Sequence, residues 1–192
     1  MRTPIELFND WFAQEKSLTK VRLPAACCLS TVGTDGFPNA RFVSLKAVED
    51  NGFVITGNLS SRKGMEIDSD TKVALTFWWP ETERQVRIQG TASKITEQLA
   101  DQYFAERNRD SQIVSIVSRQ GQEIDDLRTL VHQYEQTNAQ FSNKPLNRPA
   151  DWGGYLIEPV RIEFLEFKPT RFHHRTLYEW IDEQWQTKQI QP

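Results

Sequence analysis

Cysteine and histidine are scarce in this chain of 192 residues, which holds two cysteines and three histidines. The cysteines, Cys27 and Cys28, are adjacent and lie in an apolar stretch, so we expect two reduced thiols in or near the core. Two of the histidines, His173 and His174, are also adjacent, and no pair of cysteines has zinc-ligand spacing. The composition therefore argues against a structural disulfide and against a metal centre.

A charge excess and a long apolar run are also missing. Lys plus Arg number 23 and Asp plus Glu 26, a net charge of −3, whereas nucleic-acid binders usually carry a basic surplus. The mean hydropathy is −0.60, and no apolar run approaches the roughly 18 residues of a membrane helix. Charged residues such as Glu6 and Glu15 interrupt any signal-peptide pattern over residues 1–20. We expect one cytoplasmic domain, 1–192, with no nucleic-acid or membrane partner.

Hydrophobic spacing predicts one amphipathic helix followed mainly by strands. Thr3, Pro4 and Glu6 form a helix-start signature, and the apolar residues that follow recur at helical spacing over residues 4–17. Later residues alternate with a period of two, as in half-buried strands. We predict strands at 26–32, 39–48, 53–56, 72–79, 83–95, 152–158, 160–167, 171–180 and, more weakly, 184–190, and further helices at 60–68, 96–107, 110–118 and 123–141.

About seven strands in hairpin order, with helices inserted late, are typical of an antiparallel β-barrel with peripheral helices. The fold class is therefore mainly β with α. The sequence contains no Gly-rich phosphate loop, no HExxH and no GxSxG motif. The chemistry must instead come from cationic and amide side chains at unusual positions in a β protein.

One pair of cations precedes the third predicted strand, and a second pair follows it. Arg41 and Lys46 lie on one strand but on opposite faces unless a bulge intervenes, so a core-facing charge there needs an anion or a partner. Arg62 and Lys63 follow Ser61 at a helix start, where cations oppose the helix dipole unless an anion such as phosphate binds them. The alternative is that both groups are solvated surface charges.

Two further groups lie in the second half of the chain. Tyr103 and Arg107 are four residues apart on one helix face, and Ser111 begins the next helix, a combination that suits a second phosphate. Among its near neighbours in the sequence, this trio has no obvious acidic partner except Glu106 and Asp110. The last group is Arg171, His173 and Arg175, which would line one strand face with no carboxylate beside them. The alternative for Tyr103 and Arg107 is an ordinary surface pair on a helix. The alternative for the last group is a charged outer face of a strand.

Eight segments in this order and spacing resemble the pyridoxamine 5′-phosphate oxidase family of FMN-binding split barrels. The resemblance runs from residue 23 to residue 192 and rests on NARFVSLK, SSRKG, ERQVRIQG, YFAERNRDSQI, SRQGQEI, DWGGYLIEP, RIEF and RFHHR. It implies an FMN-binding split β-barrel with peripheral helices, working as a homodimer with the flavin between subunits.

The resemblance also implies roles for individual residues. FMN would be bound by Arg41, Phe42, Val43, Ser44, Leu45, Lys46, Thr56, Gly57, Arg62, Lys63, Gln85, Gln120 and Arg175. The substrate would lie near Lys46, with its phosphate on Tyr103, Arg107 and Ser111. Arg171 and His173 would flank the substrate ring as catalytic residues.

The implied reaction oxidises pyridoxamine or pyridoxine 5′-phosphate to pyridoxal 5′-phosphate, with O₂ reduced to H₂O₂. The sequence departs from the family pattern at several flavin-side positions, namely Thr56-Gly57, Gly121, Leu165 and His174. These departures keep open a related flavin oxidase acting on another ring, as in phenazine biosynthesis. A flavin-binding protein without turnover is the third hypothesis.

Overall fold

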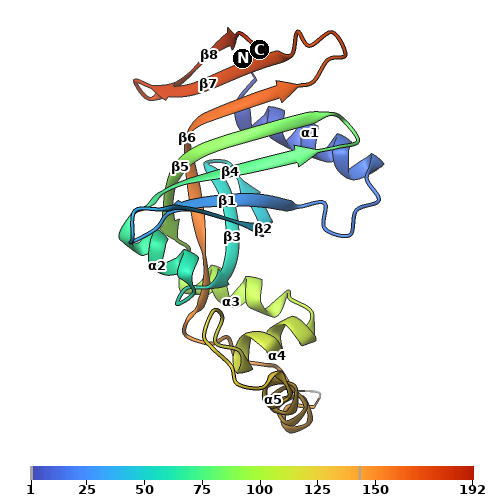
Figure 1. Ribbon diagram of the computed structural model, residues 1–192, viewed down its shortest axis with the longest axis vertical. Coiled ribbons are helices and arrows are strands. Elements are labelled where there is room, and N and C mark those ends of the chain that lie inside the picture. Colours follow the sequence, from blue (N-terminus) through green and yellow to red (C-terminus); the bar gives the residue numbers. More distant parts are fainter. Residues whose placement is uncertain (1, 143) are drawn as a thin grey trace.

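A computed structural model describes residues 2–142 and 144–192 as a β-barrel with helices beside it and at one end (Figure 1). The N-terminal half contains α1 Pro4–Leu18, β1 Ala26–Val32, β2 Pro38–Glu49, β3 Gly52–Asn58, α2 Arg62–Ser69, β4 Lys72–Trp79 and β5 Arg84–Lys94. The rest contains α3 Glu97–Ala105, α4 Arg109–Val117, α5 Leu127–Gln140, β6 Trp152–Glu166, β7 His174–Ile181 and β8 Gln184–Ile190.

Six antiparallel strands close the barrel in the order β3-β2-β1-β4-β5-β6, because β3 also pairs with β6. This closing ladder runs from Phe53 opposite Ile157 to Asn58 opposite Trp152. The β7–β8 hairpin continues the sheet beyond β6, and it lies at the opposite end of the molecule from α3, α4 and α5 (Figure 1). The predicted mainly-β barrel with peripheral helices is confirmed.

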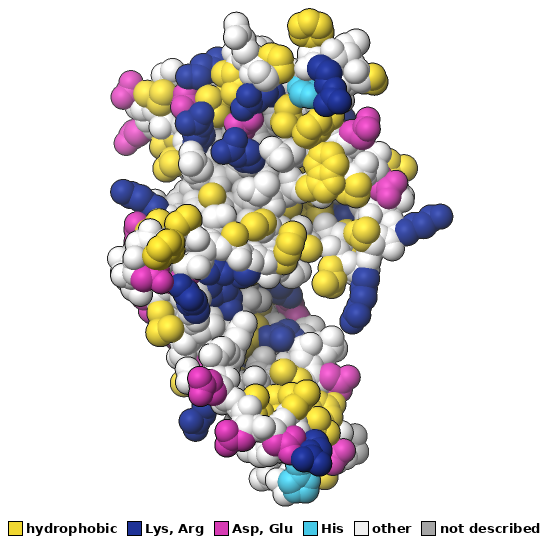
Figure 2. Space-filling model, viewed as in Figure 1, with side chains coloured by type: hydrophobic (Ala, Val, Ile, Leu, Met, Phe, Trp, Pro, Cys, Tyr) yellow, Lys and Arg dark blue, Asp and Glu magenta, His cyan; other side chains and the backbone are white. Residues whose placement is uncertain are grey.

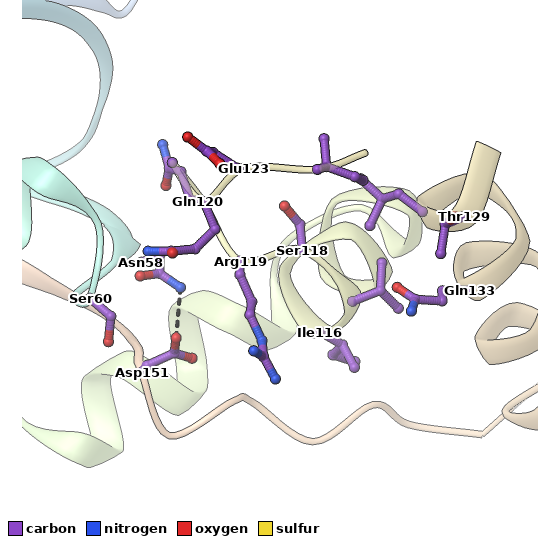
Figure 3. A pocket seen from close by; sticks show the side chains of 15 residues that line it. Asn58, Ser60, Ile116, Ser118, Arg119, Gln120, Glu123, Thr129, Gln133 and Asp151 are labelled. Atoms are coloured by element: carbon purple, nitrogen blue, oxygen red, sulfur yellow. Dashed lines mark hydrogen bonds between the residues drawn. The ribbon is translucent and has the colours of Figure 1, made fainter. Parts of the chain in front are cut away.

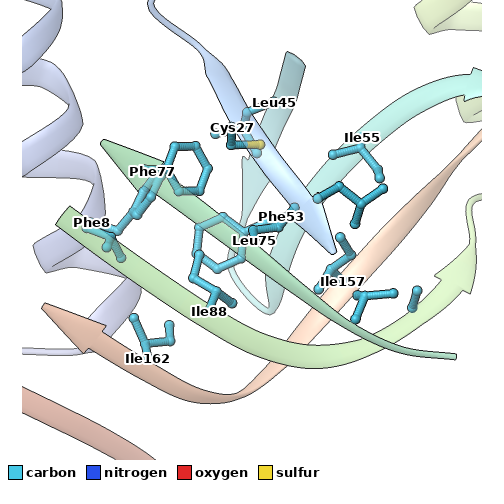
Figure 4. Packing of buried hydrophobic residues seen from close by; sticks show 14 of the residues in the cluster. Phe8, Cys27, Leu45, Phe53, Ile55, Leu75, Phe77, Ile88, Ile157 and Ile162 are labelled. Carbon is cyan, nitrogen blue, oxygen red and sulfur yellow. The ribbon is translucent and has the colours of Figure 1, made fainter. Parts of the chain in front are cut away.

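The barrel core follows the alternation in the sequence. In β5, Val86 and Ile88 are buried while Arg87 and Gln89 are exposed, as the period of two predicts. Helix α1 begins with the predicted capping box and places Phe8 against the barrel interior (Figure 4). The Phe8 ring centroid lies 4.8 Å from that of Phe53 in an edge-on contact, so α1 is fixed to the barrel by aromatic packing.

The last long barrel strand differs from the prediction of two strands, 152–158 and 160–167. A single strand, β6, spans both segments with Pro159 inside it. The register with β5 shifts between Gln89 and Gly90, which pair with Arg161 and Pro159, so Val160 is bulged out. Proline is accommodated within sheets at bulges of this kind, because it has no N–H to donate.

The strand predicted at 171–180 begins later than expected, at His174. Arg171 adopts a left-handed backbone conformation with φ of 68°, and His173 Nδ1 accepts a hydrogen bond from the backbone N–H of Lys168 at 3.0 Å. Arg171 and His173 therefore lie in a turn before β7, and they do not share a strand face with Arg175. The alternation of residue types there is not a strand pattern.

Helix α5 also begins later than the predicted 123–141, after a cap at Asp126. Its apolar stripe is exposed, since Leu127 and Val131 are 65% and 50% accessible. The periodicity identified the helix but did not indicate whether anything covers the stripe. In the described part of the chain, no helix is long and apolar enough to cross a membrane.

The close approach of β3 and β6 predicts a strong effect of one glycine. A Cβ on Gly154 would lie 2.5 Å from the backbone oxygen of Ile55, whereas a Cβ on Gly153 would meet the mobile end of the Leu59 side chain at 3.0 Å. Gly154→Ala should lower the free energy of unfolding by about 1–3 kcal/mol, the usual cost of overpacking. Gly153→Ala is the matched control and should cost clearly less. Urea unfolding measures both, and equal losses would contradict the close contact.

Candidate active site

A cleft of about 510 Å³ lies between the barrel and the helices α3 and α4. This volume is in the range of small-molecule sites. Figure 2 shows Lys and Arg side chains gathered around the waist between the barrel and the helical end. The cleft brings together these residues predicted for flavin or substrate: Phe42, Val43, Ser44, Leu45, Lys46, Thr56, Gly57, Lys63, Gln120, Tyr103 and Arg107.

The barrel wall of the cleft is the second half of β2. Phe42 is 80% exposed, and Ser44 is exposed as well, so both point out of the barrel, whereas Leu45 points into the core. The register with β3 shifts between Leu45 and Ala47, which leaves Lys46 at a bulge. Bulges redirect a side chain at the rim of a barrel. The alternative of a bulge, which the sequence left open, is the one the structure adopts.

Arg41 and Arg62 do not line the cleft, because both contact the buried carboxylate of Glu66. Glu66 Oε2 accepts from Thr31 Oγ1 at 2.5 Å and from Arg41 Nη2 at 2.7 Å, and Glu66 Oε1 accepts from Arg62 Nε at 2.8 Å. Arg62 also pairs with Asp35 at 3.2 Å. Burial alone would raise the pKa of Glu66, but these hydrogen bonds outweigh it and hold the pKa below 4.5.

Lys63 points into the cleft. Its Nζ donates to Ser61 Oγ at 2.9 Å and to Gln120 Oε1 at 3.3 Å, and no carboxylate of the described residues lies within ion-pair distance. Burial, and secondly the charge of Arg41, lower the pKa of Lys63. A half-buried ammonium without a carboxylate needs an anion, and the start of α2 beside it offers backbone N–H donors. Lys63 therefore faces the cleft, whereas the adjacent Arg62 is held outside it by Glu66.

Arg107 is the second cation of the cleft without an acidic partner among residues 2–142 and 144–192. Its guanidinium lies 5.0 Å from the ring centroid of Trp152, and burial lowers its pKa. Lys46, by contrast, pairs with Glu106 at 2.6 Å. Within this part of the molecule the cleft thus offers two uncompensated cations, Lys63 and Arg107.

The two remaining residues of the predicted phosphate group differ in position. Tyr103 lines the cleft, and its hydroxyl donates to Glu49 Oε1 at 3.2 Å, an acidic partner from β2 that sequence neighbours could not reveal. Ser111 does not line the cleft; its backbone N–H donates to Asn108 Oδ1 at the start of α4.

Four predicted residues lie away from the cleft on β5 and around β7, at the other side of the barrel. Gln85 pairs with Leu165 across β5 and β6, and Arg171 and His173 lie in the turn before β7. The prediction that Arg175 lacks a neighbouring carboxylate is wrong, because Arg175 Nη2 contacts Glu163 Oε1 at 2.7 Å. That acid comes from β6, so only the strand pairing places it there.

Other lining residues were not predicted, among them Asn58, Val114 and Trp152. Asn58 and Trp152 are paired at the end of the barrel-closing ladder, a relation that no local pattern indicates. A second, larger cleft of about 1030 Å³ shares Asn58, Ser118 and Gln120 with the first (Figure 3). There the Asn58 amide donates to Asp151 at 2.7 Å.

The closed six-stranded barrel with this cleft is a split barrel. A pyridoxamine 5′-phosphate oxidase-related, FMN-binding protein from Nostoc punctiforme has the same fold, with a TM-score of 0.81 at 17% identity over 100% of this chain and 98% of that one. The profile of the pyridoxamine 5′-phosphate oxidase family matches residues 13–141, and that of the pyridoxine 5′-phosphate oxidase C-terminal dimerisation region matches residues 152–192. The chain belongs to the pyridoxamine 5′-phosphate oxidase family.

Individual relatives agree with this assignment. The pyridoxine/pyridoxamine 5′-phosphate oxidase of Flavobacterium johnsoniae is 40% identical over 91% of this chain and 82% of its own length. That of Haemophilus ducreyi is 40% identical over 98% of this chain and 89% of its own. PhzG from Burkholderia lata, solved with tetrahydrophenazine-1-carboxylic acid, superposes with a TM-score of 0.93 at 30% identity, covering 98% of this chain and 92% of that one.

The Glu66 cluster predicts a pH-dependent contribution to stability. Because the folded-state pKa of Glu66 is lowered, its contribution is fully present above the ordinary pKa of 4.5 and is lost as the pH falls through the folded value. Glu66→Gln should cost about 3 kcal/mol at neutral pH, as removal of a buried ion-pair partner does. The difference from wild type should shrink below pH 4.5 in urea unfolding. Glu135→Gln, on exposed α5, is the control; a pH-independent difference for Glu66→Gln would contradict the assignment.

Proposed function

We propose that this protein is an FMN-dependent oxidase that converts pyridoxamine or pyridoxine 5′-phosphate to pyridoxal 5′-phosphate, with O₂ reduced to H₂O₂. With the amine substrate, water supplies the aldehyde oxygen and the nitrogen leaves as ammonia. The observation that carries the proposal is the pair of uncompensated cations, Lys63 and Arg107, which line one cleft of about 510 Å³. Two phosphates, one on the cofactor and one on the substrate, would supply the missing negative charge. The oxidase names of the relatives at 40% identity support the same reaction.

The residues at the Lys63 end fit FMN. One terminal phosphate suits one desolvated ammonium at a helix start, with Ser61 and Gln120 within hydrogen-bond distance of the same Nζ. The flavin ring would lie along the exposed face of β2, over Phe42 and Ser44. When bound, FMN supplies the acceptor for the two electrons removed from the substrate.

The residues at the Arg107 end fit the phosphate of a small ring substrate. Arg107 and Tyr103 approach the cleft from α3 and the residues that follow it, and Lys46 approaches from β2. These side chains bind the phosphate and so hold the reacting carbon at a fixed position. Fixing two reactants in one orientation supplies much of the acceleration in such reactions.

A second subunit would complete the site. Arg171, His173 and Arg175 do not line the cleft of their own chain, and they lie in the segment that matches the family's C-terminal dimerisation region. In a homodimer with two-fold symmetry, the partner's copies of these residues and of Gln85 can reach the flavin. Arg171 and His173 would then orient the substrate ring, and Gln85 would hydrogen-bond the flavin.

Oxidation of another ring, as in phenazine biosynthesis, is the second candidate. It is favoured by the similarity to PhzG, whose solved complex contains a tetrahydrophenazine carboxylic acid, at a TM-score of 0.93. A carboxylate would satisfy Arg107 with a single negative charge. Leu165 and His174, which depart from the oxidase pattern, lie on the flavin side in this interpretation.

Anaerobic mixing with pyridoxamine 5′-phosphate tests the reaction directly. The FMN-loaded protein should lose its oxidised-flavin absorbance and regain it when O₂ is admitted, with release of pyridoxal 5′-phosphate, ammonia and H₂O₂. A matched sample with pyridoxal 5′-phosphate, which is already oxidised, should show no bleaching. Flavin that remains oxidised with the phosphorylated amines and alcohols would refute the proposal, and bleaching only by a dihydrophenazine-type ring would favour the second candidate.

Sharing of the site between subunits predicts complementation. Arg107→Ala and His173→Ala should each be nearly inactive at low substrate concentration, since one loses the substrate phosphate contact and the other the ring contact. Co-expression gives hybrid dimers in which one of the two sites is intact, so about a quarter of wild-type sites should be active after random assortment. Activity that stays at the level of the single variants would show that one chain supplies both residues.

A further inference from the structure

An ion pair occupies the substrate end of the cleft. Lys46 Nζ lies 2.6 Å from Glu106 Oε2, and Gln102 Nε2 donates to Glu106 Oε1 at 3.0 Å. Lys46 Nζ also lies 4.8 Å from the ring centroid of Tyr103. Both oxygens of Glu106 are therefore held, and the carboxylate is fixed toward the one lysine at this end of the cleft.

The neighbouring groups increase the effect of this carboxylate. Glu106 directly precedes Arg107, and Glu49 accepts the hydroxyl hydrogen bond of Tyr103 at 3.2 Å. The carboxylates of Glu106 and Glu49 thus hold Lys46 and Tyr103, while Arg107 has no acidic partner among the described residues. A phosphate that binds Arg107 must either displace Glu106 from Lys46 or bind close to a like charge.

We propose that Glu106 is a specificity-determining residue that binds Lys46 in place of the substrate anion and thereby lowers the affinity of the cleft for a doubly charged phosphate. The inference rests on the proposed function, because it takes the Arg107 end as the substrate end. Glu106 acts through Lys46 and not on the reacting carbon. Its effect is therefore on binding of the charged group, not on the chemical step.

Glu106→Gln tests this with two ligands that differ only in the phosphate. The dissociation constants of pyridoxal 5′-phosphate and of pyridoxal are measured on the FMN-loaded protein from the change in flavin absorbance. In the variant, the Kd of pyridoxal 5′-phosphate should fall about two- to fivefold, the order expected for one partly exposed ion pair, while the Kd of pyridoxal stays unchanged. An unchanged Kd for the phosphate, or an equal shift for both ligands, would overturn the proposal.

Two controls separate the ion pair from overall charge. Glu135→Gln makes the same change in net charge on exposed α5, outside the cleft, and should leave both dissociation constants unchanged. In a Lys46→Met background, Glu106→Gln should lose most of its gain, because the lysine that it releases is absent. A gain that persists there, or one that Glu135→Gln reproduces, would overturn the mechanism through Lys46.

Kinetics and binding together distinguish failure of the proposed reaction from failure of the proposed role of Glu106. If pyridoxamine 5′-phosphate is oxidised, Glu106→Gln should lower its KM while kcat changes less than about twofold. A wild type that binds pyridoxal 5′-phosphate but oxidises no phosphorylated substrate would refute the proposed reaction and leave the role of Glu106 standing. Failure of every variant to bind pyridoxal 5′-phosphate would overturn both.

Discussion

The pairing of β3 with β6 is the constraint on which the rest of the structure depends. It closes the barrel and brings Asn58 opposite Trp152, and both residues line the cleft. It also fixes the end of β3, from which the chain turns into α2 and carries Lys63 into the cleft. Trp152 in turn lies beneath the Arg107 guanidinium. The two ends of the cleft are thus held by opposite strands of one ladder.

The predicted site cations differ in whether a carboxylate pairs with them. Arg41 and Arg62 are satisfied by the buried Glu66, and Arg175 is satisfied by Glu163. Lys63 and Arg107 are partly buried, and no carboxylate of the described residues pairs with either. Burying a charge in this way is costly unless an anion binds it. Lys46 is intermediate, because it lines the cleft but is paired with Glu106, a partly exposed acid. Two such cations in one cleft would let a protein with a net charge of −3 bind the two anions proposed here.

The sequence predicted the barrel, the capped first helix and the inward face of β5, because these depend on local period and capping. It also predicted most of the residues on the barrel wall of the cleft, through the resemblance of NARFVSLK and SSRKG to the oxidase family. It did not reveal the acids Glu49, Glu66 and Glu163, since each reaches its partner across strands or from another element. Nor could it show that Arg171 and His173 lie in a turn, because alternation of residue types does not exclude a left-handed backbone at Arg171.

The central claim is that Lys63 and Arg107 mark two anion positions in one cleft, and a crystal structure with FMN and pyridoxal 5′-phosphate tests it most directly. The account predicts the FMN phosphate within hydrogen-bond distance of Lys63 Nζ and the pyridoxal phosphate on Arg107, with the two rings stacked beside the exposed face of β2. A flavin bound instead in the larger cleft beside Arg119, or phosphates that leave both Lys63 and Arg107 without an anion, would contradict it.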